Sequence, residues 1–199
     1  ASNNTAIGRS ALAANTTGAG NTAVGTNAND SSSGAYNNTS IGYNADSNGT
    51  GGNGNISIGY NAQKSAVNSA GQCTLGNADI TNLRCNDQSI SALSDSRDKT
   101  DVIDSPYGLD FINTVRPVQF KWESRDGNAK DGSTRIGFLA QELLAATDGN
   151  NAVLDLVLDD NPEKLEAKYG NLLPIAIKAI QEQQTLIESL TARIETLEG

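Results

Sequence analysis

The heptapeptide LSDSRDK, residues 93–99, concentrates side chains that could do chemistry. Ser94 is a candidate nucleophile. Asp95, Arg97 and Lys99 follow it closely as candidate acids, bases or charge partners. The chain contains no histidine, so neither a Ser-His-Asp triad nor a Cys-His pair can form within it, and a nucleophile here needs another base. The heptapeptide is therefore either a solvated, charged linker or a place at which the chain is cut.

The composition argues against several classes of function. The chain has 199 residues, with 23 acidic and 14 basic side chains and a formal net charge of −9. Nucleic acids and anionic membranes repel such a protein, so we expect no nucleic-acid partner. No apolar run reaches the roughly 18 residues that read as a membrane-spanning helix. We therefore expect no membrane insertion.

The two cysteines, Cys73 and Cys85, indicate no metal site. They lie twelve residues apart, neither has a CxxC partner, and the chain offers no histidine to complete a zinc site. We expect no metal and no cofactor, and we expect both cysteines to be small buried or half-buried side chains.

The sequence before the heptapeptide repeats with a fixed period. The motif NTAVGTNA at 21–28 recurs in related form at 4–11, 38–45 and 55–62, and a weaker fifth copy ends at residues 74–76. Its glycine returns every 17 residues, at Gly8, Gly25, Gly42, Gly59 and Gly76. The aliphatic residue before the glycine keeps the same step, at Ile7, Val24, Ile41, Ile58 and Leu75.

A period this short is typical of a solenoid, in which each repeat is one coil stacked on the next. Glycine permits tight corners, and Asn, Ser and Thr suit turns. Each coil has about one aliphatic residue to bury, so a single-chain stack would have a thin interior. We infer that several chains associate and share it. The alternative, a disordered low-complexity linker, does not require an apolar residue at a fixed period. We predict an all-β, β-roll or β-helix-like solenoid over residues 1–93.

The second half of the sequence is that of an α+β domain. GLDFINTV at 108–115 predicts a short helix that ends before Pro117. The alternation over residues 118–122 predicts a strand with Phe120 and Trp122 in the core. Further expected elements are a polar loop at 123–133, a strand leading into a helix at 135–147 and a strand at 152–160.

The last element is a predicted helix over about 171–198 with a heptad pattern. Its a positions are Leu173, Ile180, Ile187 and Ile194, and its d positions are Ala176, Gln183, Leu190 and Leu197. Gln183 would place a polar group in a coiled-coil seam, and Arg193 and Glu198 have the spacing of an interchain ion pair. Ile at a with Leu at d favours two strands, but RIETLE at 193–198 resembles the trimer signature of short coiled coils. We favour three chains over a helix packed on its own domain.

Four motifs of the second half resemble a known family. They are SDSRDK at 94–99, GLDFINTVRPVQFKW at 108–122, IGFLAQE at 136–142 and YGNLLPIAIKAIQEQ at 169–183. In this order they resemble the intramolecular chaperone domain of bacteriophage tail spikes and tail fibres, an auto-cleaving endosialidase-type domain (peptidase family S74). The resemblance covers residues 94–199. The 17-residue repeats are similar to those of phage tail fibres and of the heads of trimeric bacterial adhesins.

The resemblance implies an assembly cycle for a homotrimeric fibre. The C-terminal domain, residues 94–199, would trimerise, bring three copies of residues 1–93 into register, and then be cut off between Leu93 and Ser94. The mature fibre would be kinetically trapped, because its unfolding is no longer the reverse of its folding. The expected location is the virion, with the chaperone domain released in the host cytoplasm. A host cell-surface receptor is a candidate partner.

By the same resemblance, Ser94 is the nucleophile and Lys99 the general base of a single-turnover serine endopeptidase that acts on its own chain alone. Ser-Lys pairs are a known alternative where histidine is absent. A lysine in water titrates near about 10.4, so such a base requires burial or a nearby cation, here Arg97. The attack would come from the Ser94 hydroxyl by an N-to-O acyl shift, or from another chain. Asp95 and Arg97 would orient the loop, or act only as turn and salt-bridge residues.

Three further residues near these motifs need an interpretation of their own. Asp98 departs from the family, in which an apolar residue is common, and its carboxylate would favour a protonated lysine next to it. Cleavage would then be slow or absent. Gln141 and Glu142 are interpreted as structural residues at a helix start. The sequence singles out no carboxylate pair for glycoside hydrolysis.

Two other functions stay open. A non-cleaving trimeric adhesin or fibre with a C-terminal trimerisation domain would serve only as a binding or spacer structure. Ser94→Ala separates it from the self-cleaving chain, because only the latter would lose a proteolytic event. An ordinary Ser-Lys protease that acts on other proteins is disfavoured, since no substrate cleft is recognisable and the serine adjoins a domain boundary.

Overall fold

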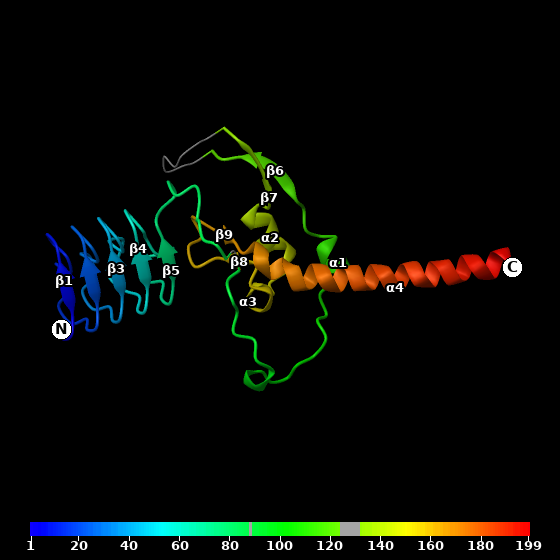
Figure 1. Ribbon diagram of the computed structural model, residues 1–199, viewed down its shortest axis with the longest axis horizontal. Coiled ribbons are helices and arrows are strands. Elements are labelled where there is room, and N and C mark those ends of the chain that lie inside the picture. Colours follow the sequence, from blue (N-terminus) through cyan, green and yellow to red (C-terminus); the bar gives the residue numbers. More distant parts are fainter. Residues whose placement is uncertain (88, 124–131) are drawn as a thin grey trace. The chain divides into compact units, whose positions relative to one another are not determined.

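The computed structural model describes residues 1–87, 89–123 and 132–199 (Figure 1). The contacts within it separate two units. The first includes residues 1–84 and 160–164, and the second comprises 85–122, 132–159 and 165–199. Most of the polar loop predicted at 123–133 lies outside the described residues.

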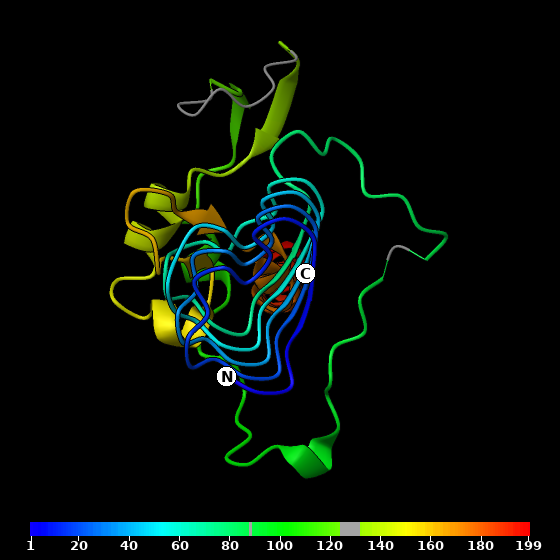
Figure 2. The ribbon, with the colours of Figure 1, turned by 90° about the vertical axis from the view of Figure 1, so that its left-hand side faces the viewer.

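The first unit contains the parallel β-solenoid that the 17-residue period predicts. Its five strands form one sheet in chain order, β1 (Thr5–Ile7), β2 (Thr22–Val24), β3 (Thr39–Ile41), β4 (Ile56–Ile58) and β5 (Cys73–Leu75). Each strand pairs in parallel with the next, so that Ala6 lies beside Ala23 and Ile7 beside Val24. Figure 2 shows the coils stacked on one another. The predicted solenoid fold is confirmed for these five coils, and the alternative of a disordered linker is wrong for them.

The interior of the solenoid is built from alanines and asparagines. Ala23, Ala28, Ala45 and Ala62 are fully buried. Asn38 connects its coil to the next: its Oδ1 accepts the backbone N–H of Asn55 at 2.8 Å, and its Nδ2 donates to the Gly52 carbonyl at 3.0 Å. Asn21 and Asn55 make the equivalent bonds. This asparagine ladder satisfies polar groups that would otherwise be buried without partners.

The glycine of each repeat is required by the close approach of consecutive coils. Gly25 and Gly42 have φ angles of +134° and +132°, a region that glycine adopts far more readily than other residues. A Cβ atom on Gly25 would lie 2.4 Å from the carbonyl oxygen of Gly42. Any larger residue would therefore push the coils apart at this corner.

The aliphatic residue of each repeat points outward in the single chain. Ile7, Ile41, Ile58 and Leu75 are 61%, 39%, 39% and 52% exposed. Alternate residues of a strand face opposite sides, so the neighbouring Ala23, Ser40 and Ser57 point into the coil and are buried. We call the outward row Ile7, Val24, Ile41, Ile58 and Leu75 the aliphatic ladder.

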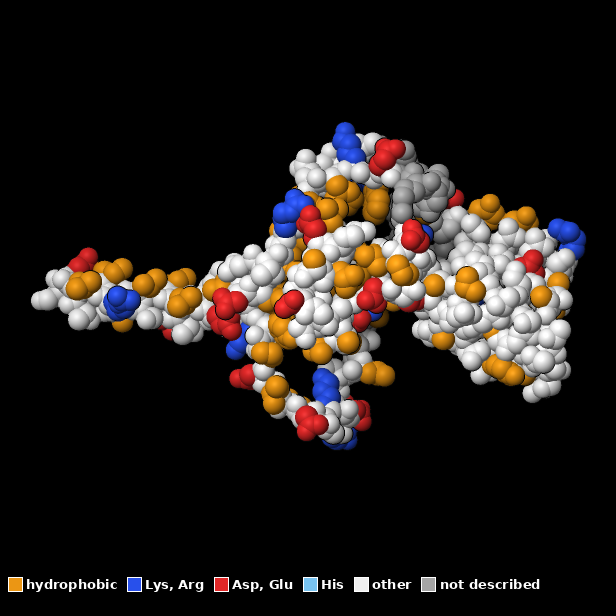
Figure 3. Space-filling model, turned by 180° about the vertical axis from the view of Figure 1, so that it is seen from behind, with side chains coloured by type: hydrophobic (Ala, Val, Ile, Leu, Met, Phe, Trp, Pro, Cys, Tyr) orange, Lys and Arg blue, Asp and Glu red, His pale blue; other side chains and the backbone are white. Residues whose placement is uncertain are grey.

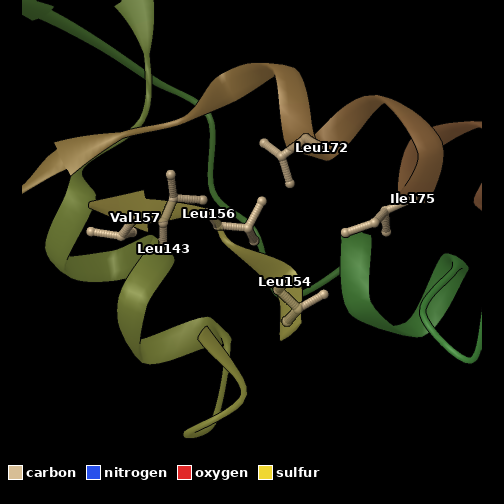
Figure 4. Close-up of a cluster of buried hydrophobic side chains, with 6 residues drawn as sticks. All are labelled: Leu143, Leu154, Leu156, Val157, Leu172 and Ile175. Atoms are coloured by element: carbon tan, nitrogen blue, oxygen red, sulfur yellow. The ribbon is translucent and has the colours of Figure 1, made fainter. Parts of the chain in front are cut away.

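The second unit is an α+β region ending in a long helix, as predicted. Its elements in chain order are η1 (Ser96–Asp98), α1 (Leu109–Ile112), β6 (Val118–Lys121), β7 (Thr134–Gly137), α2 (Ala140–Ala146), α3 (Asn151–Leu154), β8 (Val157–Leu158), β9 (Glu166–Ala167), η2 (Tyr169–Asn171) and α4 (Leu172–Glu198). β6 pairs antiparallel with β7, and β8 with β9. Figure 4 shows the core side chains, Leu143, Leu154, Leu156, Val157, Leu172 and Ile175.

The strand predicted at 152–160 is wrong over its first half. Residues Asn151–Leu154 form the helix α3, and Asp155, with φ +47°, ends it. The side chain of Asn151 decides this geometry, because its Oδ1 accepts the Val157 N–H at 3.1 Å and its Nδ2 donates to the Val157 carbonyl at 2.9 Å. Only Val157–Leu158 remains extended, as β8.

Two predictions of burial are also wrong. Trp122 is 62% exposed, because it lies just beyond the last residue of β6; its ring packs edge-on against Phe120, with ring centroids 5.3 Å apart. Cys73 and Cys85 are free and exposed. Cys73 lies on β5 with its side chain on the same outward face as Leu75, and Cys85 lies in an exposed segment.

Helix α4 carries apolar side chains both where it is buried and where it is exposed. Leu172, Ile175 and Ala179 are buried in the core of the unit, whereas every residue from Gln183 to the C-terminus is exposed. Figure 3 shows hydrophobic side chains following one another along this exposed part of the helix. Packing of the helix on its own domain therefore accounts for the buried residues near its start and not for the apolar residues of its exposed part.

Candidate functional site

The heptapeptide lies in a long exposed segment. Every described residue from 78 to 106 is exposed, and the side chain of Leu93 is fully open to solvent. The 3-10 turn η1 begins two residues after Ser94. An exposed segment is accessible to a cutting group, but its geometry depends on local hydrogen bonds.

A capped turn fixes the conformation of this segment. Asp95 is the N-cap of η1, and its Oδ1 accepts the backbone N–H of Arg97 at 2.9 Å. The N–H groups of Asp98 and Lys99 close the turn by donating to the carbonyls of Asp95 and Ser96 at 3.2 and 3.3 Å. The predicted role of Asp95 as a turn residue therefore has a concrete basis.

The side chain of Arg97 binds the Asp95 carboxylate, which caps the same turn. Its Nε donates to Asp95 Oδ1 at 3.0 Å and its Nη2 donates to Oδ2 at 2.5 Å. The Arg97 side chain, followed by its backbone N–H, lowers the pKa of Asp95, and the carboxylate raises the pKa of Arg97. The pair is exposed, so it adds little to global stability. Its effect is to hold the turn in shape.

The turn brings Ser94 and Lys99 together. Lys99 Nζ lies 2.6 Å from Ser94 Oγ and donates a hydrogen bond to it. This distance falls within the range in which a base can take a proton. A neutral Lys99 would accept the hydroxyl proton across the same gap. The hydroxyl belongs to the residue directly after the Leu93 carbonyl, so an intramolecular attack needs no second element.

The single chain does not shield this pair from water. Both side chains are exposed, and water weakens the electrostatic effects that activate a base. Arg97, the predicted neighbouring cation, is engaged by Asp95. Any shielding of the pair therefore has to come from outside the exposed segment.

Residues 94–154 match one family model, Peptidase_S74, chaperone of endosialidase. The match begins at Ser94, the residue that contacts Lys99. The chain thus carries a peptidase S74 chaperone domain after its β-solenoid. Comparison with curated proteins and with solved structures gave no match.

Within the S74 domain, Glu142 makes a structural contact. Arg116 donates from Nε to Glu142 Oε2 at 3.0 Å and from Nη2 to Oε1. This two-bond contact connects Arg116 to the first turn of α2. The Glu142 carboxylate raises the pKa of Arg116. Gln141 is exposed in the same turn. Sequence reasoning named Glu142 but missed its partner.

Downstream of the matched residues, α4 carries the predicted coiled-coil side chains on its exposed part. They are Ile180, Gln183, Ile187, Leu190, Arg193, Ile194, Leu197 and Glu198. Among the described residues, no group of histidines, cysteines and carboxylates is arranged to hold a metal ion. The helices in the described part of the chain include none that is long and apolar enough to cross a membrane.

A buried ion pair in the solenoid was missed by sequence reasoning. Lys64 Nζ lies 2.7 Å from Asp46 Oδ1, and the two side chains are 1% and 0% exposed. Burial raises the pKa of Asp46, and the contact with Lys64 opposes that rise. Lys64 follows Asp46 by 18 residues, one repeat plus one position. The 17-residue period could therefore have placed the two on adjacent coils.

Proposed function

We propose that the chain is the C-terminal part of a homotrimeric viral tail fibre or spike, and that its S74 chaperone domain cuts the Leu93–Ser94 bond after assembly. The carrying observation is the 2.6 Å contact between Ser94 and Lys99 at the first residue of the S74 match. The preceding solenoid is the expected client of such a chaperone. This function places the protein in the virion, where a host cell-surface receptor is a candidate partner.

Two rows of uncovered aliphatic side chains support a trimer. The aliphatic ladder runs along the solenoid, one residue per coil. On α4, the a and d residues from Ile180 to Leu197 are exposed together. Burying one such side chain contributes about 1.5–3 kcal/mol, so association along both rows would be strongly favourable. Gln183 would set the register of the coil, and Arg193 and Glu198 would pair between chains.

The cleavage step balances within the chain and one water molecule. Lys99, once neutral, takes the proton of the Ser94 hydroxyl, and Oγ attacks the Leu93 carbonyl carbon. The Leu93–Ser94 amide breaks as the nitrogen receives that proton, leaving an ester between Leu93 and Ser94 Oγ. Water hydrolyses the ester, which gives a Leu93 carboxylate and a free α-amine on Ser94. A hydroxyl from another chain of the trimer would give the same two products.

Assembly would complete the site. In the single chain the Ser94–Lys99 pair is exposed, so a neighbouring chain is the natural source of the shielding that activates a lysine. Cleavage would then follow trimerisation. The chaperone domain would be released only from fibres whose three chains are in register. Asp98, next to Lys99, opposes this activation and slows the cut.

Expression of residues 1–199 beside Ser94→Ala tests the proposal. Denaturing gels and intact mass should show two fragments that meet at 93/94 in the wild type and one whole chain in the variant. Sedimentation should show a trimer for both. A wild-type chain that stays whole and trimeric would instead support the non-cleaving fibre with a C-terminal trimerisation domain.

A further inference from the structure

The asparagine ladder of the solenoid changes at its last coil. In the coils before it, Asn21, Asn38 and Asn55 each donate Nδ2 to a carbonyl of the following coil. The equivalent position of the fifth coil is Gln72, whose backbone N–H still donates to Asn55 Oδ1 at 3.0 Å. β5 is the last strand of the sheet. Within the described residues, no further coil follows to which the Gln72 amide can donate.

Gln72 instead folds back and helps to form a cradle of donors. Its Oε1 accepts the Ser65 backbone N–H at 2.9 Å, and its Nε2 donates to Ser65 Oγ at 2.5 Å. The Ser69 hydroxyl lies 3.1 Å from that of Ser65. All three side chains are half-buried. The cradle thus gathers hydroxyl and amide hydrogens at the end of the ladder.

A carboxylate fills the cradle. Asp160 Oδ2 accepts the Ser65 hydroxyl at 2.6 Å, the Ser69 hydroxyl, and Gln72 Nε2 at 3.1 Å. Asn161 adds a bond from its Nδ2 to the Ser65 carbonyl at 2.8 Å. The bonds from Ser65 and then Ser69 lower the pKa of Asp160, so it is held as an anion. Residues 160–164 accordingly belong to the unit that contains the solenoid.

We propose that Asp160 and Asn161 form the C-terminal cap of the solenoid. The carboxylate takes the place of the carbonyl that a sixth coil would present to the ladder. A stack of repeats needs such a cap because its end coil otherwise leaves groups unpaired. The substitution of Gln for Asn at position 72 supports this role, since the extra methylene extends the amide beyond the reach of the ladder residues.

The cap recognises a folded coil. Ser65, Ser69 and Gln72 converge on one oxygen atom only when their coil is closed, so Asp160 binds the finished end of the fibre and not an extended chain. This consequence rests on the proposed function: Asp160 lies after the 93/94 bond, so the cut would turn the cap into a non-covalent ligand. The cap would then hold the fibre end during assembly and could be shed afterwards.

Hydrogen exchange tests the cap without depending on cleavage. All variants carry Ser94→Ala, so each chain stays whole whether or not the wild type cuts itself. Asp160→Ala should speed the exchange of peptides covering residues 65–72 by roughly three- to tenfold, because loss of a hydrogen-bonded contact lowers local protection. Peptides covering β2 and β3 should be unchanged. The matched control Asp159→Ala removes a neighbouring carboxylate and should leave residues 65–72 protected.

Gln72→Asn provides a second variant from the other side of the contact. It restores the ladder residue of the other coils but removes the methylene that reaches Asp160. It should also speed exchange at 65–72, because it removes the Nε2 bond to Asp160 and the Oε1 bond to the Ser65 N–H, while the Ser65 and Ser69 hydroxyls still bind the carboxylate. Exchange at 65–72 that is equal in the Asp160→Ala and Asp159→Ala chains would overturn the proposal. Faster exchange throughout the chain in the Asp160→Ala variant would overturn it as well.

Discussion

The solenoid and the exposed segment each bring a lysine against an oxygen atom, in opposite environments. Lys64 lies 2.7 Å from a carboxylate and is buried with it. Lys99 lies 2.6 Å from a hydroxyl and is exposed. The nearly equal distances show that contact alone does not make a reactive site. Lys64 pairs with a buried carboxylate, whereas Lys99 contacts an exposed hydroxyl group that carries a proton.

Removing one partner of the buried pair should have the largest effect. Lys64→Ala leaves the Asp46 carboxylate buried without a countercharge, which costs about 3–5 kcal/mol. Denaturant unfolding measures this loss as the difference between the Ser94→Ala chain, which serves as the parent, and the same chain with Lys64→Ala, at one protein concentration.

Replacing both partners provides the control. The position of Asp46 corresponds to Leu12 in the first coil, 34 residues earlier. Asp46→Leu combined with Lys64→Met should therefore unfold close to the parent chain, because apolar replacements of a buried ion pair are often neutral or stabilising. A double variant as unstable as Lys64→Ala would show that the pair itself is required.

Loss of the turn should slow the reactive pair without unfolding the domain. Asp95→Ala removes the N-cap of η1 and frees Arg97, so Lys99 would meet Ser94 less often. We expect the rate of appearance of fragments to fall about tenfold. Asp101→Ala, a nearby exposed carboxylate outside the turn, is the control. Equal rates for the two variants would remove the turn from the mechanism.

Asp98 should have a smaller and opposite effect. Asp98→Ala removes the carboxylate next to Lys99 and so favours a neutral amine. Fragment formation should accelerate by roughly three- to tenfold. A time course by intact mass at pH 7 measures it. Unchanged or slower cleavage would contradict the role given to this carboxylate.

The pH dependence of the buried pair should be the smallest effect. Burial raises the pKa of Asp46 in the folded chain above its ordinary value of 3.8. The unfolded chain therefore loses this proton first as the pH rises, and the contribution of Asp46 to folding becomes less favourable from about 3.8 up to the raised value. The unfolding free energy of the parent should fall across this window relative to the Asp46→Leu/Lys64→Met chain. A constant difference would contradict the shift.

The regular parts of the molecule were predictable because they depend on local pattern. The 17-residue period gave the solenoid and its glycine corners, and the heptads gave the long helix. The predicted burial of Trp122 and the predicted strand at 152–160 were wrong, because Trp122 lies beyond the end of β6 and the side chain of Asn151 overrides alternation.

The candidate site was predictable only in part. The Ser94–Lys99 contact spans five residues across one turn, so a motif could indicate it. The Asp160 contact with Ser65 spans 95 residues, and neither period nor motif links them. Contacts at that separation depend on the tertiary fold and require a structure.

The central claim is that the contact of Lys99 with Ser94 cuts the chain, and Lys99→Gln tests it most directly. Glutamine keeps a polar side chain at that position but cannot act as the base. Intact mass and N-terminal analysis should show the wild type yielding a fragment that begins at Ser94, while the trimeric Lys99→Gln chain stays whole. Cleavage of Lys99→Gln at the wild-type rate, or a new N-terminus at another residue, would contradict the account.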